Sequence, residues 1–154
     1  MSGSKKYFST LQESVISKYL GWKQVSGSGN RHFHPGDIVC SKWLGECKTH
    51  TQISSVISFK FADWDKIEKE ANSQFKLPVL FTDNGSQIVY NTYVMIKIDK
   101  NLVPEDYIQG DYSDNKSISF NITELADYKF FKRYNDIYMI LPLNQFKRNI
   151  EYFE

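Results

Sequence analysis

Two short apolar segments of this chain carry ionisable side chains, and this combination limits the folds that the chain can adopt. The segments are Gly36-Asp37-Ile38-Val39-Cys40 and Trp43-Leu44-Gly45-Glu46-Cys47-Lys48. Side chains alternate between the two faces of a β-strand, so Glu46 and Lys48 share one face. A charge in apolar surroundings is costly unless it is paired or binds a metal ion. The pattern therefore predicts two neighbouring strands that carry a site made of Asp37, Glu46 and Lys48.

The context of this acidic-x-Lys triplet matters more than the triplet itself. The chain holds three such triplets: Glu46-x-Lys48, Asp114-x-Lys116 and Asp127-x-Lys129. The second lies in a polar stretch typical of a solvated turn. The third lies in an expected helix, where residues i and i+2 do not share a face. Only the first follows a second carboxylate, Asp37, on a neighbouring apolar segment. A surface ion pair is the alternative interpretation of Glu46 and Lys48.

Length and composition set further limits. With 154 residues, the chain is long enough for one domain with a sizeable core, and 16% aromatic residues argue against disorder. The net charge of +1 means that a nucleic acid would have to be held by a local patch. No apolar run approaches the roughly 18 residues of a membrane span. Only two cysteines are present, so we expect a soluble protein of a reducing cytoplasm without a disulfide framework.

Hydrophobic periodicity predicts alternating helices and strands. Helices are expected at 5–20, ended by Gly21, and at 61–76, with Asp63 as a candidate N-cap. Strands are expected at 22–25, 36–41, 43–50, 77–82, 87–98 and 137–141. The remaining segments are a loop at 26–35, an irregular stretch at 99–121, a short helix at 123–132 and a terminal helix from 142. This order predicts an α/β fold with a mixed central β-sheet flanked by helices.

The order of these residues is similar to that of a known nuclease family. Gly36-Asp37 followed by Glu46-x-Lys48 resembles the PD-(D/E)XK motif, although Pro35 lies one position further from the aspartate than in that motif. A helix carrying Glu13 precedes the strands, and another helix follows the lysine. The Ser/Gly-rich loop at 25–31 resembles that of archaeal-type Holliday junction resolvases. The resemblance covers about residues 5–82. It implies one nuclease domain over 1–154, with a restriction-endonuclease-like core at about 5–98 and a C-terminal extension at about 99–154.

Hydrolysis of a phosphodiester needs a positioned hydroxide and neutralisation of charge on the phosphate oxygens. Mg²⁺ held by one or two carboxylates supplies both, and we expect Mn²⁺ to substitute. The direct ligands would be Asp37, Glu46 and the backbone carbonyl of Cys47. Glu13 would bind through water or at a second metal position, with an ordinary solvated helix carboxylate as the alternative. Lys48 would orient or deprotonate the attacking water, or stabilise the developing anion; we assign no role to Gln12.

The resemblance implies a Mg²⁺-dependent DNA endonuclease acting on branched DNA. A junction with two-fold symmetry calls for two active sites and hence a homodimer, in a prokaryotic or phage-infected host. The alternatives are a restriction-type or nicking endonuclease on duplex DNA, or a non-catalytic binding protein with the same fold. The candidate DNA contacts are Ser26, Ser28, Arg31, His32, His34 and Lys60. Arg31 is the strongest of these because a guanidinium can hold a phosphate in a bidentate way.

Other groupings are better explained by packing. His32, His34, His50, Cys40 and Cys47 invite a zinc interpretation, but the chain has no CxxC or HxxxH pair. Strand parity also places both cysteines on the face opposite Asp37 and Glu46. We therefore expect the cysteines in the core. Core packing is also expected for Phe61 with Trp64, with a base-stacking platform as the alternative. The stripe of Phe146, Ile150 and Phe153 is expected to pack within the chain, with a dimer interface as the alternative.

Overall fold

The computed structural model describes residues 2–25, 36–125 and 128–154. The helices are α1 (Ser2–Leu20), α2 (Phe61–Ser73), α3 (Leu143–Arg148) and α4 (Ile150–Phe153). The strands are β1 (Lys23–Gln24), β2 (Ile38–Val39), β3 (Trp43–Lys48), β4 (Val56–Lys60), β5 (Leu77–Asp83), β6 (Thr92–Ile98), β7 (Ile108–Asp111), β8 (Ser117–Asn121), β9 (Lys129–Arg133) and β10 (Asp136–Pro142). Short 3₁₀ turns cover Val89–Asn91, Lys100–Leu102 and Glu105–Tyr107.

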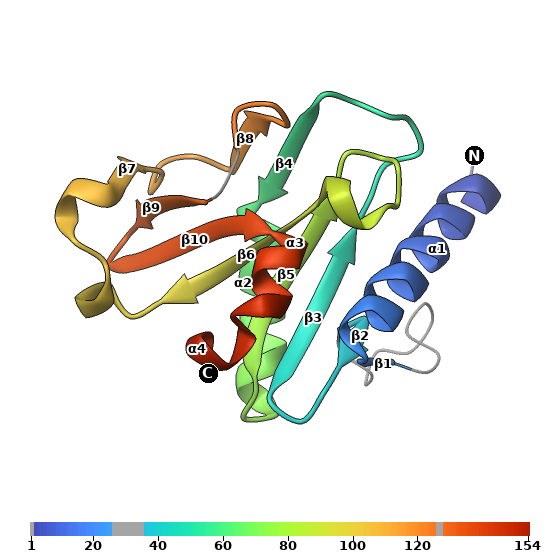
Figure 1. Cartoon of the computed structure of the whole chain (residues 1–154), viewed down its shortest axis with the longest axis horizontal. Helices are drawn as coiled ribbons and strands as arrows, with labels where there is room; N and C mark the ends of the chain where they lie inside the picture. The colour runs from blue at the N-terminus through green and yellow to red at the C-terminus, as the bar shows by residue number, and fades with distance from the viewer. Residues whose placement is uncertain (1, 26–35, 126–127) are drawn as a thin grey trace.

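Eight of the strands form one mixed sheet in the order β1-β2-β3-β5-β6-β10-β9-β7 (Figure 1). β3 and β5 run parallel and are joined through α2, and β7 runs parallel to β9. The other neighbouring strands of this sheet are antiparallel. β4 and β8 form a separate antiparallel pair. This large mixed sheet flanked by helices confirms the predicted α/β class.

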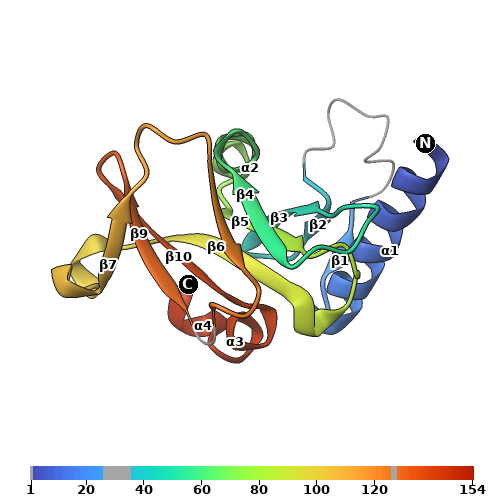
Figure 2. The same ribbon diagram turned by 90° about the horizontal axis from the view of Figure 1, so that it is seen from above.

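One face of the sheet is covered by α2 and the β4–β8 pair (Figure 2). The apolar stripe of α2 buries Phe61, Trp64, Ile67 and Ala71, and this stripe packs on Leu44 and other sheet residues. Burying one such large side chain stabilises the fold by about 1.5–3 kcal/mol. The expectation that Phe61 and Trp64 belong to the core is confirmed.

The opposite face is covered by α1 and by the C-terminal helices α3 and α4. Its core joins Ile16 of α1 to Trp43 and Cys47 of β3 and to Phe146 of α3. Ile150 and Phe153 pack against this core, so the predicted packing stripe is confirmed. Gly21 ends α1 in a left-handed conformation (φ 75°), and its N–H donates to the carbonyl of Ser17 (2.8 Å), as expected for a helix that stops at glycine.

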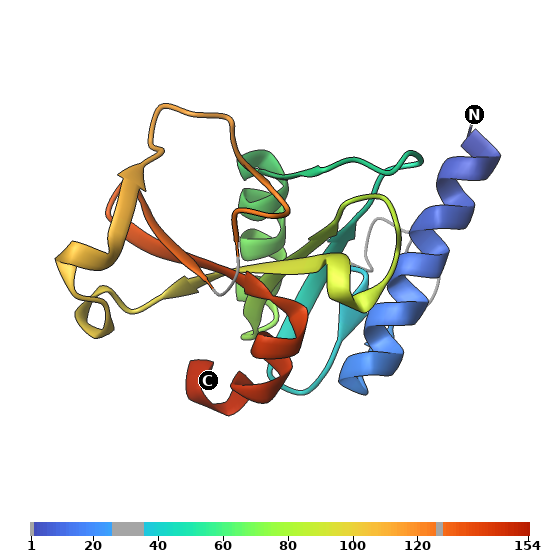
Figure 3. The ribbon, with the colours of Figure 1, turned by 45° about the horizontal axis from the view of Figure 1, so that its top comes forward.

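The sheet does not stop where the core was expected to end at residue 98. β10, β9 and β7 add to the edge beyond β6, at the opposite end of the sheet from α1 (Figures 1 and 3). β8, from the stretch expected to be irregular, pairs with β4 on the α2 side. The extension therefore shares the sheet and the hydrophobic core of the first half.

Several predicted elements are wrong. The helix expected at 123–132 is replaced, over its described end, by strand β9, because this segment pairs in full register with β10. The stretch at 99–121 contains β7 and β8, and strand β4 was not predicted at all. β6 begins at Thr92 instead of 87, because Gln87 has a positive φ of 55° and a 3₁₀ turn follows it. β4 and β7 pair with strands that are distant in sequence, β8 and β9 respectively, and local periodicity does not report such partners. β9 instead pairs with its neighbour β10, so there the apolar pattern was assigned the wrong period.

Candidate active site

β3 carries the central pair of the site. Its residues alternate between the two cores, with Leu44 on the α2 side and Trp43 and Cys47 on the α1 side. By the same parity, Glu46 and Lys48 point to the α2 side. The Glu46 side chain is only 8% exposed, and its Oε2 lies 3.2 Å from the ammonium of Lys48. The ion pair considered from the sequence is present, but only its lysine lies at the surface: the Lys48 side chain is 46% exposed, whereas the Glu46 carboxylate is buried.

Asp37 lies at the bend before β2 rather than inside a strand as predicted. Its N–H donates to the carbonyl of Gly45 (2.8 Å), and its Oδ2 accepts the N–H of Cys47 (2.8 Å). Gly36, just before it, has a φ of 77°, and a Cβ there would lie 2.6 Å from the Leu44 side chain. A glycine is thus required to bring the Asp37 carboxylate against the backbone next to Glu46.

The carboxylates of the site act on one another. Burial and the negative charge of Glu46 raise the pKa of Asp37 to about 7, with Glu13 adding to the rise and the Cys47 N–H opposing it. Burial and the charge of Glu46 also raise the pKa of Glu13 on α1. The charges of Glu13 on α1, Asp37 at the bend before β2 and Glu46 on β3 therefore influence one another. Like charges gathered in this way favour the binding of a cation.

Lys48 behaves as a cation in this site. Burial would lower its pKa, but the charges of Glu46 and Asp63 outweigh that effect and raise it. The Asp63 Oδ1 lies 3.9 Å from the ammonium. The prediction that Asp63 caps α2 is wrong, because the N-cap position is Lys60, and Asp63 lies in the first turn of the helix. Among the roles left open for Lys48, charge stabilisation fits this environment better than proton abstraction.

Gln12 is part of the site, although the sequence analysis gave it no role. Its side chain is 1% exposed, and its Nε2 donates a hydrogen bond to the backbone carbonyl of Lys48. Its Oε1 is buried without a hydrogen-bond partner among the described residues. Phe8, Gln12 and Ile16 follow at i, i+4 and i+8, so helical spacing already placed a polar amide on an inward-facing stripe. That signal was available and was missed.

A second polar group lies where β3 and β5 end. Asp83 is fully buried, and its Oδ1 accepts the hydroxyl of Thr49 (2.6 Å) and the N–H of Gly85 (2.8 Å). The Nε2 of Gln87 donates to the same Thr49 hydroxyl (2.9 Å). Burial raises the pKa of Asp83 in spite of these donors. This network fixes the chain directly after Lys48 and was not predicted.

The remaining candidate residues fare differently. Ser26, Ser28, Arg31, His32 and His34 lie outside the described residues. Lys60 is exposed at the end of β4, directly before the turn of α2 that carries Asp63. Cys47 is buried in the α1-side core, and burial holds the pKa of its thiol well above the ordinary range. Core packing therefore explains Cys47 better than zinc binding does.

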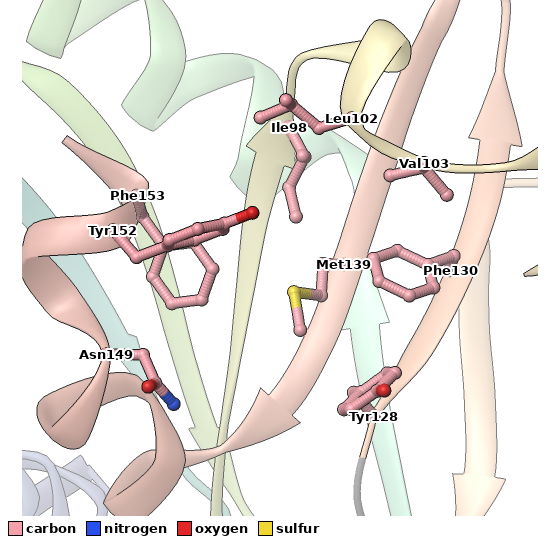
Figure 4. Close-up of a pocket in the computed structure, with 9 residues that line it drawn as sticks. All are labelled: Ile98, Leu102, Val103, Tyr128, Phe130, Met139, Asn149, Tyr152 and Phe153. Atoms are coloured by element: carbon pink, nitrogen blue, oxygen red, sulfur yellow. The ribbon is translucent and has the colours of Figure 1, made fainter.

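A separate hollow of about 300 Å³ lies on the extension. Its floor contains Ile98, Phe130 and Met139 of the sheet, and Tyr152 and Phe153 of α4 form one side (Figure 4). None of the carboxylates of the site lines it. The hollow is therefore a different feature from the site at the end of β3.

Two further observations concern metal-ligating groups and membrane-spanning helices. Within the part of the chain that the structure describes, no three His, Cys, Asp or Glu side chains form a group that could hold a metal ion. A cation would therefore need backbone and water oxygens besides Asp37 and Glu46. Across the same residues, no helix is both long and apolar enough to cross a lipid bilayer.

No family model matches the chain, and neither curated proteins nor solved structures gave a match.

Proposed function

We propose that the protein is a Mg²⁺-dependent DNA endonuclease of the PD-(D/E)XK type. The observation that carries the proposal is the buried Glu46 carboxylate, which stands beside Lys48 on one strand and acts electrostatically on Asp37 and Glu13. A structural ion pair needs one carboxylate for its lysine. Additional partly buried carboxylates, here Asp37 and Glu13, raise the energy of the folded protein unless a cation compensates them.

The donor set fits Mg²⁺. Mg²⁺ prefers oxygen ligands and is usually held by one or two carboxylates with several waters retained. Asp37 and Glu46 would hold the ion, together with the carbonyl of Cys47. Oδ2 of Asp37 accepts the N–H of Cys47, and Oε2 of Glu46 pairs with Lys48. A bound Mg²⁺ would supply an activated water and neutralise phosphate charge. Mn²⁺ would fit the same oxygens.

The protein side chains have separable roles in this proposal. Lys48 stays an ammonium and stabilises negative charge on the scissile phosphate. Glu13 orients water on the α1 side of the site. Asp37 and Glu46 would hold the ion. The parallel β3–β5 pair crossed by α2, with α1 on the other face, supports the resemblance to this nuclease fold.

The substrate that we propose is branched DNA, resolved by a homodimer. This rests on the loop at 25–31 and on its likeness to resolvases, with Lys60 as a phosphate contact at the mouth of the site. The two cysteines of the chain are free, which suits the reducing cytoplasm of a prokaryote or a phage-infected host. Four-way junctions and linear duplexes of equal length, cleaved in parallel, test this choice. A monomer that cuts linear duplex alone would instead be a restriction-type or nicking enzyme.

The central test is cleavage by Glu46→Gln and Lys48→Ala. Each should lower the cleavage rate by at least about 10³-fold, since each removes a group that acts on the reacting phosphate. DNA binding measured in Ca²⁺ should persist. Glu70→Gln on α2, where Glu70 pairs with Lys66, is the matched control and should retain the rate. Full activity of both site variants would contradict the proposal, and a wild type without cleavage or metal binding would favour a non-catalytic binding protein.

A further inference from the structure

Lys48 is contacted from both faces of the sheet. On the α1 side, the amide of Gln12 donates to its backbone carbonyl. On the α2 side, Asp63 Oδ1 lies 3.9 Å from its ammonium, and Glu46 Oε2 lies 3.2 Å from it. The end of a strand is normally free to fray, so a tie from each flanking helix is unusual for one exposed lysine.

The Asp63 contact is important for Lys48 because, in the proposed function, Glu46 would interact with both Lys48 and the divalent cation. A divalent cation bound by Glu46 would compensate the Glu46 charge, and Asp63 would then be the main counter-ion of the Lys48 ammonium. Asp63 does not depend on the ion, and its side chain is only 24% exposed. It is held in the first turn of α2 between Phe61 and Trp64, which are both buried. The backbone that carries the Asp63 carboxylate is therefore held in place by the buried neighbours of Asp63.

The Gln12 contact fixes the other end of the same residue. The buried Gln12 amide donates a hydrogen bond to the Lys48 carbonyl, and this bond restrains the backbone at Lys48. Gln12 directly precedes Glu13, so the same turn of α1 that supplies a carboxylate also grips β3. Thr49, the next residue, is held separately by Asp83. The backbone carbonyl of Lys48 and the side chain of the following residue are thus held before substrate arrives.

We propose that Asp63 and Gln12 are positioning residues that hold Lys48 at the scissile phosphate, Asp63 through the ammonium and Gln12 through the backbone. This inference rests on the proposed nuclease function. Neither residue touches the reacting atoms. Both act through Lys48, so their loss slows the chemical step without weakening the binding of DNA.

Single-turnover cleavage by Asp63→Asn tests the first contact. The variant keeps the size of the side chain and removes its charge, so kcat should fall about tenfold while KM and Mg²⁺ affinity stay unchanged. Asp63→Glu should recover part of the rate, and Glu70→Gln on the same helix should behave as wild type. Wild-type kcat in Asp63→Asn, with Lys48→Ala inactive, would overturn the inference and leave the proposed function standing.

The reactivity of the Lys48 amine tests the same contact without any cleavage. Limited acetylation by acetic anhydride, followed by peptide mass spectrometry, compares Lys48 with the exposed Lys23 in one sample. Asp63→Asn should raise the Lys48 to Lys23 ratio several-fold, both in metal-free protein and with saturating Mg²⁺. An unchanged ratio would overturn the role of Asp63, whether or not the protein is a nuclease.

Gln12→Met tests the second contact, since methionine fills a similar volume and cannot donate to the Lys48 carbonyl. Amide hydrogen exchange at Lys48 and Thr49 should accelerate about tenfold or more, while Val94 in the centre of the sheet exchanges as in wild type. The single-turnover rate should fall with KM unchanged. Leu11→Ala, one position earlier on α1 and partly exposed, is the control. Unchanged exchange at Lys48 and Thr49 would overturn the role of Gln12.

Discussion

Two clusters of charged side chains include residues from the start of α2, and they differ in their balance of positive and negative charge. Near the first turn of α2, Arg133 of β9 donates two hydrogen bonds to Asp65, at 2.8 and 2.9 Å. Its guanidinium also lies over the ring of Phe61, 4.6 Å from the ring centre. At the other cluster, Lys48 faces Glu46 and Asp63 while Asp37 and Glu13 add further negative charge. The Arg133–Asp65 pair is balanced, whereas the Lys48 cluster has an excess of carboxylates.

The difference shows which buried charges serve the fold. A bidentate pair with one charge of each sign compensates its own charge, although the Nε of Arg133 is buried without a hydrogen-bond partner among the described residues. The Asp65 carboxylate raises the pKa of Arg133 further above its usual range. The carboxylate cluster instead raises the pKa of Asp37 into the neutral range. Perturbed acids of this kind gather at functional sites, where binding or catalysis compensates the loss of stability. The comparison is consistent with a structural role for the first cluster and with the function proposed for the second.

Arg133→Met should therefore destabilise the protein most. Methionine keeps part of the packing over Phe61 but removes both hydrogen bonds to Asp65. We expect the free energy of unfolding to drop by about 2–3 kcal/mol, moderated because the Asp65 side chain is 54% exposed and can hydrate. Urea denaturation followed by circular dichroism measures this change. The specific activity of the folded fraction should stay at the wild-type level, and a selective loss of activity would place Arg133 in the site instead.

Asp37→Asn should raise the free energy of unfolding, in contrast to Arg133→Met. The native Asp37 holds its proton up to about pH 7, whereas its ordinary pKa is 3.8. The native state thus binds more protons than the unfolded chain between these values, so the free energy of unfolding falls as the pH rises through them. Asparagine removes this fall and retains an acceptor for the Cys47 N–H. At pH 8, without divalent metal, the variant should be more stable than wild type by about 2 kcal/mol.

Urea denaturation of both proteins at pH 4.5 and pH 8 checks this prediction. The gap between Asp37→Asn and wild type should widen from the lower to the higher pH. The Arg133–Asp65 pair supplies the contrast, because Arg133→Met should differ from wild type by a similar amount at both values. A variant less stable than wild type at pH 8 would mean that Asp37 is a structural acceptor and not a crowded carboxylate.

The site was easier to predict than the far half of the fold, for a physical reason. Parity on one strand fixed the face of Glu46 and Lys48, and the mixed sheet with its two flanking helices followed from apolar periodicity. Asp63, in contrast, meets Lys48 only because α2 folds back over β3. Its place in the first helical turn looked like a cap from sequence alone. Contacts between segments far apart in the chain have no local signature.

The extension illustrates a second limit, which is the choice between helix and strand in a segment whose partner is the next strand. Lys129–Arg133 became a strand because β10 offers a partner along its whole length, while its own composition allowed a helix. Gln12 is a different case, since its position between Phe8 and Ile16 at helical spacing marked it as inward-facing. A polar residue on an apolar stripe could have been recognised before the structure was known. Its partner, the carbonyl of Lys48, could not.

Added Mg²⁺ should change the stability of the protein least of the three tests. It should also distinguish the two clusters most clearly, because only the carboxylate cluster is proposed to bind the ion. A ligand at ten times its Kd stabilises the native state by about 1.4 kcal/mol, which raises Tm by roughly 3–5 °C in a protein of this size. We expect that shift at pH 8 in wild type and undiminished in Arg133→Met, because the balanced pair has no need of a cation. Glu46→Gln should abolish it, since one of the two proposed carboxylate ligands is gone. Thermal melts in MgCl₂, with KCl at matched ionic strength as the control, measure the shift. An equal shift in Glu46→Gln would show that the ion binds elsewhere, and the excess of carboxylates at the end of β3 would then need another explanation.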